Sequence, residues 1–336
     1  MLKQIAENIY RKTVPLPHNP LRELNAYIIK GEKSLLIDTG FNRPECEEAL
    51  QSAFDELGID AVDLFITHLH SDHCGLVSKF AKEQSRVFAS ETDGELINFS
   101  SGNLYWSMLD ELFIKFGFPR ADFGRNTDIH PGRQYCNGEM VKFTTVAEGD
   151  VLEYGGYRLE AVAAPGHTPG HMCLYDREKK ILLGGDLILG TISPNICIEL
   201  CAENPLRDYL ESLAKVGQMD VRLLLAAHGT EITDMNARIR ELCAHHEARL
   251  AEVQKILGSG WKTAYMVAPE MNWDISCRTW EDFPAPQKWF ATGEAISHLQ
   301  YLYFAGKAQR EEREGGYWFR NACRRKYLPE KDGFFM

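Results

Sequence analysis

The sequence predicts a mixed α+β fold with a large strand-rich domain followed by a small C-terminal domain. Short apolar runs typical of buried strands alternate with longer segments whose apolar residues recur at helical spacing. The length of 336 residues and the hydrophobic content of 44% suffice for a large core and an appended unit. Because Gly258-Ser259-Gly260 is a turn signal, we expect domains at 1–257 and 261–336.

The expected strands are short apolar runs bounded by turn residues, and the expected helices carry start and stop signals. Pro44 suits a first helical turn, and Gly306 suits a helix C-cap. Residues 95–140 break the alternation and are expected to form helices and loops. Strands are predicted over 26–30, 34–38, 63–67, 151–154, 157–164, 172–175, 181–184 and 221–226, helices over 44–57, 75–82, 206–215, 236–257 and 287–304, and a hairpin over 307–312 and 317–320.

Composition excludes several classes of protein. The net charge of −11 argues against wholesale binding to nucleic acid or to an anionic membrane. Nine scattered cysteines without a Cys-x-x-Cys pair argue against a disulfide framework or a zinc knuckle. The N-terminus lacks the apolar run of a signal peptide, and no stretch reaches transmembrane length. We therefore expect a cytoplasmic protein that does not insert into a membrane.

Ligand-type side chains crowd the end of the strand predicted over 63–67. His68, His70, Asp72 and His73 fall within six positions. His68 and His70 are two apart and share one side of an extended chain, whereas Asp72 and His73 follow the start of a turn. Three imidazoles packed against a carboxylate without a metal would leave buried polar atoms unpaired. The cluster therefore predicts metal binding, and its two directions favour two ions.

Three further candidate ligands occupy the same kind of position, directly after a predicted strand. His167 lies in the turn Ala164-Pro165-Gly166-His167, Asp186 follows Gly184-Gly185, and His228 follows the apolar run that ends at Ala227. Each metal ion needs ligands beyond the opening cluster, and the ends of other strands are where they are expected.

In the order and character of these motifs, the chain resembles the metallo-β-lactamase-fold hydrolase superfamily. The ligand motifs span residues 68–228, and the fold resemblance spans about 1–250. The resemblance implies an αββα sandwich of two facing sheets with outer helices and a site along one edge. It also implies a metal-bridging hydroxide as the nucleophile.

The resemblance assigns a role to each ligand. It implies that His68, His70 and His167 hold one metal, that Asp72, His73 and His228 hold the other, and that Asp186 bridges them. Asp72 would also accept a hydrogen bond from the nucleophile or pass a proton. Zn is the expected metal, while Fe, Mn and Ni suit the same ligands.

Two more residues are candidates for orienting the ligands from outside. Asp38, in Ile37-Asp38-Thr39-Gly40, resembles a family position that orients a ligand imidazole, although Asp before Thr-Gly equally suits an ordinary turn. His171 lies four residues after His167, beyond Pro169-Gly170. A plain structural role is the stronger interpretation for His171, and an orienting role is the alternative.

Departures from known branches narrow the expected substrate. Zinc β-lactamases of the common type have Cys where this chain has Asp186, and the oxygen-reducing diiron branch has Glu where it has His70. The acyl-homoserine lactonases carry a Tyr soon after the bridging Asp, whereas Leu187 follows here. A small thioester, ester or lactone remains the expected substrate, as in glyoxalase II, although that enzyme's glutathione-binding residues are not recognisable. The aromatic 95–140 segment either forms a lid that selects an apolar acyl group or packs in a core or homodimer contact.

Two rival activities stay open at this stage. The helix over 287–304 and its hairpin resemble the winged-helix appendage of β-lactamase-like endoribonucleases, and a basic cluster follows: Arg320, Arg324, Arg325 and Lys326. RNA phosphodiester hydrolysis is therefore the main alternative, opposed by the acidic chain. A mononuclear iron persulfide dioxygenase is the third interpretation.

Overall fold

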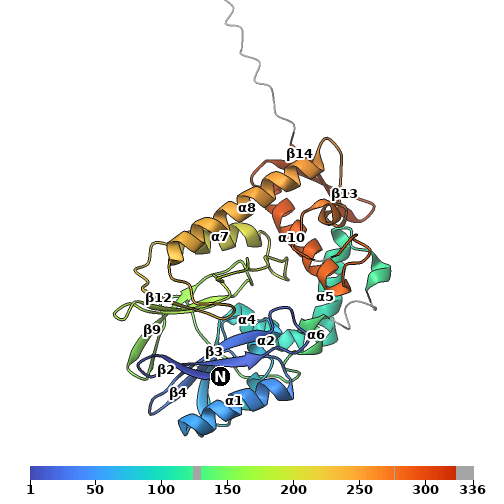
Figure 1. Ribbon diagram of the computed structural model, residues 1–336. Helices are drawn as coiled ribbons and strands as arrows, with labels where there is room; N and C mark the ends of the chain where they lie inside the picture. Colours follow the sequence, from blue (N-terminus) through green and yellow to red (C-terminus); the bar gives the residue numbers. More distant parts are fainter. Residues whose placement is uncertain (124–129, 276, 323–336) are drawn as a thin grey trace, which may run out of the picture.

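The computed structural model describes residues 1–123, 130–275 and 277–322. Two β-sheets face each other, with α1 outside the first sheet and α7 and α8 outside the second (Figure 1). This arrangement confirms the predicted α+β sandwich.

The two sheets combine antiparallel and parallel pairings. The first follows chain order from β1 to β7, antiparallel up to β4 and parallel from β4 onward. The second has the order β12-β11-β10-β9-β8, and only its β11–β12 pair is parallel. The strands are β1 Leu2–Ala6, β2 Ile9–Pro15, β3 Glu23–Ile29, β4 Ser34–Ile37, β5 Val62–Phe65, β6 Val87–Ala89, β7 Thr144–Thr145, β8 Val151–Tyr154, β9 Tyr157–Ala163, β10 Met172–Asp176, β11 Ile181–Gly185 and β12 Leu223–Ala226.

Alternate residues of the strands serve two separate cores. Leu35 and Ile37 of β4 pack between the sheets with Leu159 and Leu183, whereas Leu36 belongs to the core beneath the helices. Because both faces are covered, β4 is buried throughout and appears in the sequence as an unbroken apolar run.

Four of the five helices predicted with bounds occur close to their predicted positions, and the fifth needs a correction. The helix predicted over 75–82 is wrong in its bounds: two short helices replace it, and the first already contains Asp72 and His73. Gly75 joins them, and its backbone lies too close to Gly40 and Asn42 for a side chain. The helices are α1 Pro44–Leu57, α2 Ser71–Cys74, α3 Val77–Phe80, α4 Glu91–Ser100, α5 Asn103–Lys115, η1 Arg120–Asp122, α6 Pro131–Gln134, α7 Pro205–Val216, α8 Met235–Leu257, α9 Ala264–Val267, η3 Ala268–Glu270 and α10 Ala285–Phe304.

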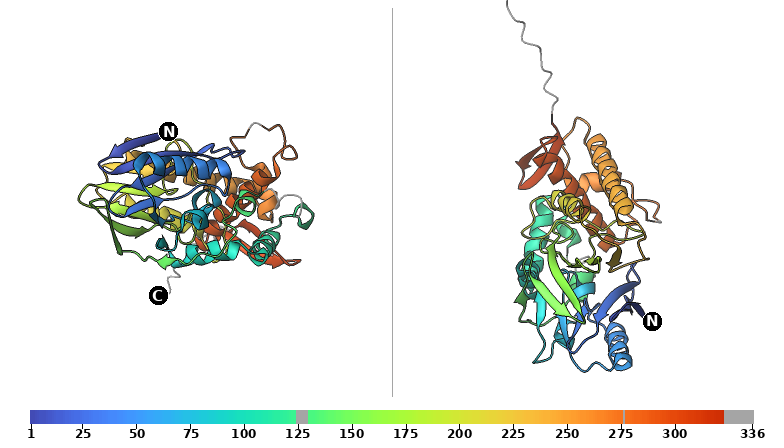
Figure 2. Two further views of the ribbon diagram at one scale, coloured as in Figure 1. Left: turned by 90° about the horizontal axis from the view of Figure 1, so that it is seen from below. Right: turned by 90° about the vertical axis from the view of Figure 1, so that its left-hand side faces the viewer.

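The C-terminal segment packs onto the sandwich beside the 95–140 segment (Figures 1 and 2). Helix α10 is followed by the hairpin of β13 (Ala308–Arg313) and β14 (Gly316–Asn321). Phe113 of α5 stacks on Trp289 of α10 with ring centroids 4.2 Å apart. Several aromatic side chains of the segment are therefore core residues, and the lid and homodimer roles stay predictions.

Two predictions about the C-terminal segment reach beyond what the structure describes. The winged-helix arrangement is represented here by one helix and one hairpin, and it stays a prediction. Arg324, Arg325 and Lys326 of the predicted basic cluster lie outside the described residues.

Within the described ranges, no helix has both the length and the apolar character needed to cross a membrane.

The turn that carries His167 depends on a glycine. Gly166 has φ +131°, and a Cβ there would lie 2.3 Å from the backbone of Tyr209 in α7. We expect Gly166→Ala to lower the free energy of unfolding by about 1–3 kcal/mol more than Gly156→Ala. Gly156 also has a positive φ, +83°, but a Cβ there meets nothing within 4 Å. Urea denaturation of both variants measures the difference, and equal losses would contradict it.

Candidate metal centre

The structure brings all seven predicted ligands together at one edge of the sandwich. They follow strands β5, β9, β11 and β12, so the two sheets contribute to the same place. Three overlapping groups each have one ligand atom per residue within 4.8 Å of one another. The groups are His68, His70 and His167; His68, His73 and Asp186; and Asp72, His73 and His228.

The first group joins the opening motif to the 164–171 turn. His68 Nε2 and His70 Nδ1 are 3.1 Å apart, and the His70 and His167 rings lie 4.6 Å apart between centroids. The extended backbone at His70 (φ −64°, ψ 143°) keeps the two histidines of the motif on one side. Three imidazole nitrogens thus surround one small volume.

The second group is built from helix α2 and the turn after β12. His73 Nε2 lies 3.3 Å from His228 Nε2, which lies 3.4 Å from Asp72 Oδ2. Asp72 and His73 lie in the short helix α2, and the His73 ring also contacts that of His68, with centroids 3.9 Å apart.

Asp186 lies between the two groups and offers one carboxylate oxygen to each. Its Oδ1 is 3.6 Å from His73 Nε2 and 3.5 Å from His228 Nε2, and its Oδ2 is 3.6 Å from His167 Nε2. Gly185, with φ +52°, ends β11 and turns the chain so that the carboxylate enters the cluster.

Hydrogen bonds at the far ring nitrogens fix the tautomers of two ligands. His167 Nδ1–H donates to Asn195 O at 2.9 Å, and His228 Nδ1–H donates to Glu23 O at 2.8 Å. Each ring therefore carries its proton on Nδ1 when neutral and turns the Nε2 lone pair toward the cluster.

Asp38 contacts a histidine of the second group directly and reaches one of the first group through Thr67. Its Oδ2 accepts a hydrogen bond from His73 Nδ1–H at 2.8 Å and another from the Thr67 hydroxyl at 2.8 Å. The Thr67 oxygen in turn accepts from His68 Nδ1–H at 3.0 Å. Asp38 has φ +61°, an uncommon conformation for a residue other than glycine, and its carboxylate is buried.

His171 contacts the backbone of a ligand. Its Nε2 accepts a hydrogen bond from the Asp186 N–H at 3.1 Å, and its ring lies 5.1 Å from that of His68. The side chain is fully buried, and it braces the turn after β11.

Burial and neighbouring charges divide the histidines into two kinds. Burial and the adjacent imidazoles push the pKa of His68 well below its usual range, and burial lowers that of His70 to about 3. Burial also opposes a charge on His73, but the carboxylates of Asp38, Asp186 and Asp72 raise its pKa well above normal. At neutral pH the first group therefore presents neutral nitrogen donors.

The donor set fits divalent cations. His167 Nε2 and Asp186 Oδ1 are buried without a hydrogen-bond partner among the described residues, yet both face the other donors. Burying a polar atom without a partner costs about 1–3 kcal/mol, and a cation in each donor group would satisfy the atom that faces that group. Imidazole nitrogens and carboxylate oxygens are ligands that divalent transition metals prefer.

Sequence reasoning missed Asp93, which ties the opening motif to the 164–171 turn. Its buried carboxylate accepts hydrogen bonds from Leu69 N–H (2.9 Å), the Thr168 hydroxyl (2.6 Å) and Gly170 N–H (2.7 Å). Burial raises its pKa to about 6, although these donors oppose the rise. The sequence shows only a helix start at Ser90, whose hydroxyl accepts from Asp93 N–H, and nothing local indicates the remote partners.

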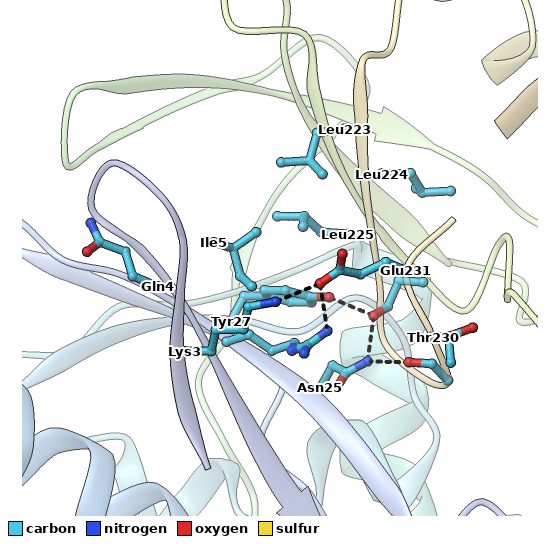
Figure 3. Close-up of a pocket in the computed structure, with 13 residues that line it drawn as sticks. Lys3, Gln4, Ile5, Asn25, Tyr27, Leu223, Leu224, Leu225, Thr230 and Glu231 are labelled. Carbon is cyan, nitrogen blue, oxygen red and sulfur yellow. Dashed lines mark hydrogen bonds and ion pairs between the residues drawn. The ribbon is translucent and has the colours of Figure 1, made fainter. Parts of the chain in front are cut away.

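The turn that carries His228 is also braced from the first sheet. Tyr27 OH donates to Ala226 O at 2.8 Å, and Asn25 Nδ2 donates to Ala226 O and Gly229 O. These side chains line a polar pocket of about 160 Å³ beside the turn, where Lys3 pairs with Glu231 (Figure 3).

The sequence matches the models of two known protein families. The model of the metallo-beta-lactamase superfamily matches residues 20–97 and 125–228, which include every candidate ligand. The chain belongs to the metallo-beta-lactamase superfamily. A second model, the metallo-beta-lactamase-like C-terminal domain, matches residues 281–322, which contain α10 and its hairpin.

Relatives in this superfamily cover nearly the whole chain. A crystal structure of a metallo-beta-lactamase family protein from Thermus thermophilus is 30% identical, with a TM-score of 0.80 over 95% of this chain and 100% of that one. The probable metallo-hydrolase YqjP of Bacillus subtilis is 26% identical over 93% of this chain and 95% of its own length. With this family and this donor cluster, the chain is a metal-dependent hydrolase.

The placement of Asp38 under two ligands predicts that metal affinity depends on it. Asp38→Asn keeps a residue that tolerates positive φ but turns an amide toward the His73 N–H. We expect the affinity for zinc to fall about 10- to 100-fold, as is typical when a partner of a metal-bound histidine is lost. Competition with a chromophoric chelator measures it.

Asp176→Asn is the matched control for Asp38→Asn. Asp176 is equally buried and accepts backbone N–H bonds from Arg158 and Lys179. Equal zinc affinity in both variants and the wild type would contradict the role of Asp38.

Proposed function

We propose that the chain is a dinuclear metal-dependent hydrolase that acts on a small thioester, ester or lactone, with thioesters preferred. The position of Asp186 carries the proposal, because its two oxygens face different donor groups. A single ion would leave one of these groups without a cation.

Each candidate ligand has an assigned place in this proposal, and Asp72 has a second task. One cation would be held by His68, His70 and His167 and the other by Asp72, His73 and His228, and the Asp186 carboxylate would reach both. Zinc is the preferred metal. When bound, two such cations would supply hydroxide at neutral pH by lowering the pKa of water.

Asp72 is positioned to handle a proton. Burial would raise its pKa, but the His73 charge and the His228 hydrogen bond lower it to about 2. The carboxylate is therefore ionised at neutral pH, and it accepts a hydrogen bond from the nucleophile or carries the proton toward the leaving group.

An aromatic cluster beside the ligand loop supports an apolar acyl group. His130 contacts the rings of Trp106, Trp289 and Phe290 at centroid distances of 5.4, 4.5 and 5.1 Å. The next residue, Pro131, accepts a hydrogen bond through its carbonyl from Ser71 in α2, directly before Asp72. We propose that this cluster receives the acyl chain.

One relative supports a thioester substrate over an oxygen ester or a lactone. A protein of Emericella nidulans that is 25% identical over 67% of this chain and 57% of its own length is an atrochrysone carboxyl ACP thioesterase. A sulfur leaving group is also a weaker base than an alkoxide, so its departure needs less protonation. By contrast, the RNA alternative gains nothing from Arg320, whose guanidinium packs over Trp261 and bonds to Gln309.

The bridging role proposed for Asp186 predicts that Asp186→Ala loses both bound metal and hydrolase activity. We expect the purified chain to bind about two equivalents of zinc and Asp186→Ala to lower thioester turnover by at least about 100-fold, more than the loss of an outer partner. Elemental analysis and release of free thiol measure both. A wild type that holds a single iron and turns over only with oxygen would contradict the proposal.

The substrate class is tested separately with zinc-loaded protein. We expect hydrolysis of medium-chain acyl thioesters to exceed cleavage of a structured RNA at equal enzyme concentration. If the aromatic cluster receives the acyl chain, Trp289→Ala should raise KM for longer acyl chains more than for acetyl thioesters. Efficient RNA cleavage without thioesterase activity would overturn the choice of substrate.

A further inference from the structure

A chain of hydrogen bonds connects the C-terminal helix to a candidate metal ligand. Glu294 of α10 accepts a hydrogen bond from Asn195 Nδ2 at 3.1 Å, and Asn195 O accepts from His167 Nδ1–H at 2.9 Å. We infer that Glu294 is a positioning residue that sets the direction of the His167 ring through Asn195. The inference rests on the metal-binding role proposed for His167.

Asn195 needs an external anchor because the segment around it has no regular structure. Residues 186–204, between β11 and α7, contain no helix or strand. By comparison, the carbonyl that holds His228 belongs to Glu23 of strand β3. The direction of Asn195 O is therefore set by what the loop packs against.

Helix α10 provides that packing surface. A Cβ at Gly293 would lie 2.0 Å from Cys197 Sγ, so the loop approaches the helix closely at this glycine. From the other side, Tyr105 of α5 donates its hydroxyl to Glu199 at 2.7 Å. The loop is thus held between α5 and α10.

Glu294 is itself fixed in place. Its Oε1 accepts from Nε and Nη2 of Arg249, both at 3.3 Å, while Oε2 remains for Asn195. Arg249 in turn pairs with Glu252 at 2.9 Å and lies over the ring of Trp273 at 4.3 Å. The Glu294 and Arg249 side chains are almost fully buried, so neither moves freely. Glu294 and Glu252 thus share Arg249, but only Glu294 contacts Asn195.

This difference defines the experiment. Zinc affinity is measured on the full chain by competition with a chromophoric chelator for the wild type, Glu294→Ala, Asn195→Ala and the double variant. We expect each single change to weaken one of the two zinc equivalents roughly 3- to 10-fold, below the roughly 10- to 100-fold expected for a direct partner of a ligand. The double variant should bind zinc no more weakly than the single variant with the lower affinity, because both changes break the same chain of hydrogen bonds.

Two conservative variants separate positioning from mere stability. Glu294→Gln keeps a hydrogen-bonding partner for the Asn195 amide and should stay within about 2-fold of the wild type. Glu252→Ala removes a carboxylate from the same Arg249 without touching Asn195, and it should leave zinc affinity unchanged. If Glu252→Ala lowers zinc affinity as much as Glu294→Ala does, the loss reflects general destabilisation of the protein and the inference is wrong.

The outcomes also separate this inference from the proposed function. His167→Ala should remove one zinc equivalent, and if it does not, the assignment of the metal ligands fails. If His167→Ala does so but folded Glu294→Ala and Asn195→Ala bind zinc like the wild type, only the positioning role fails. Should Glu294→Ala not fold, Asn195→Ala decides, because it leaves the Arg249–Glu294 pair intact.

Discussion

The confinement of seven donor side chains to one small buried volume is the constraint on which the other features depend. Three imidazole nitrogens of one group and the Asp186 carboxylate that reaches both groups lie within a few ångströms, where like charges and unpaired lone pairs repel. The fold meets this constraint by bringing the ends of strands from two sheets to one edge. This arrangement requires an uncommon backbone conformation at Asp38 and a close approach of Gly166 to the backbone of Tyr209.

Much of the fold and of the site was predictable because the relevant signals are local. Helix α1 occurs over the predicted residues, and β8 matches as well. The strands before Asp186 and His228, β11 and β12, are unbroken apolar runs since both of their faces are covered. Strands β1 and β2 were missed because Lys3, Gln4, Arg11 and Lys12 interrupt their apolar pattern. The histidine cluster was visible because its residue types have few other uses at such spacing.

The positioning residues were less visible, because their partners are remote in sequence. Asp93 reaches Thr168 across 75 positions, and Glu294 reaches Asn195 across 99. Asp38 was found only through family resemblance, and nothing local distinguished its role from that of a turn. Such contacts join elements that the fold alone makes neighbours. These contacts link the C-terminal helix to the candidate metal centre, since α10 packs against the loop whose Asn195 carbonyl accepts a hydrogen bond from His167.

Anomalous X-ray scattering at the zinc edge, from crystals grown with zinc, tests the two-metal centre most directly. We expect two peaks at this edge of the sandwich. One lies among His68, His70 and His167, the other lies among Asp72, His73 and His228, and Asp186 contacts both. A single peak, with one of the two donor groups hydrogen-bonded only to itself or to water, would contradict it.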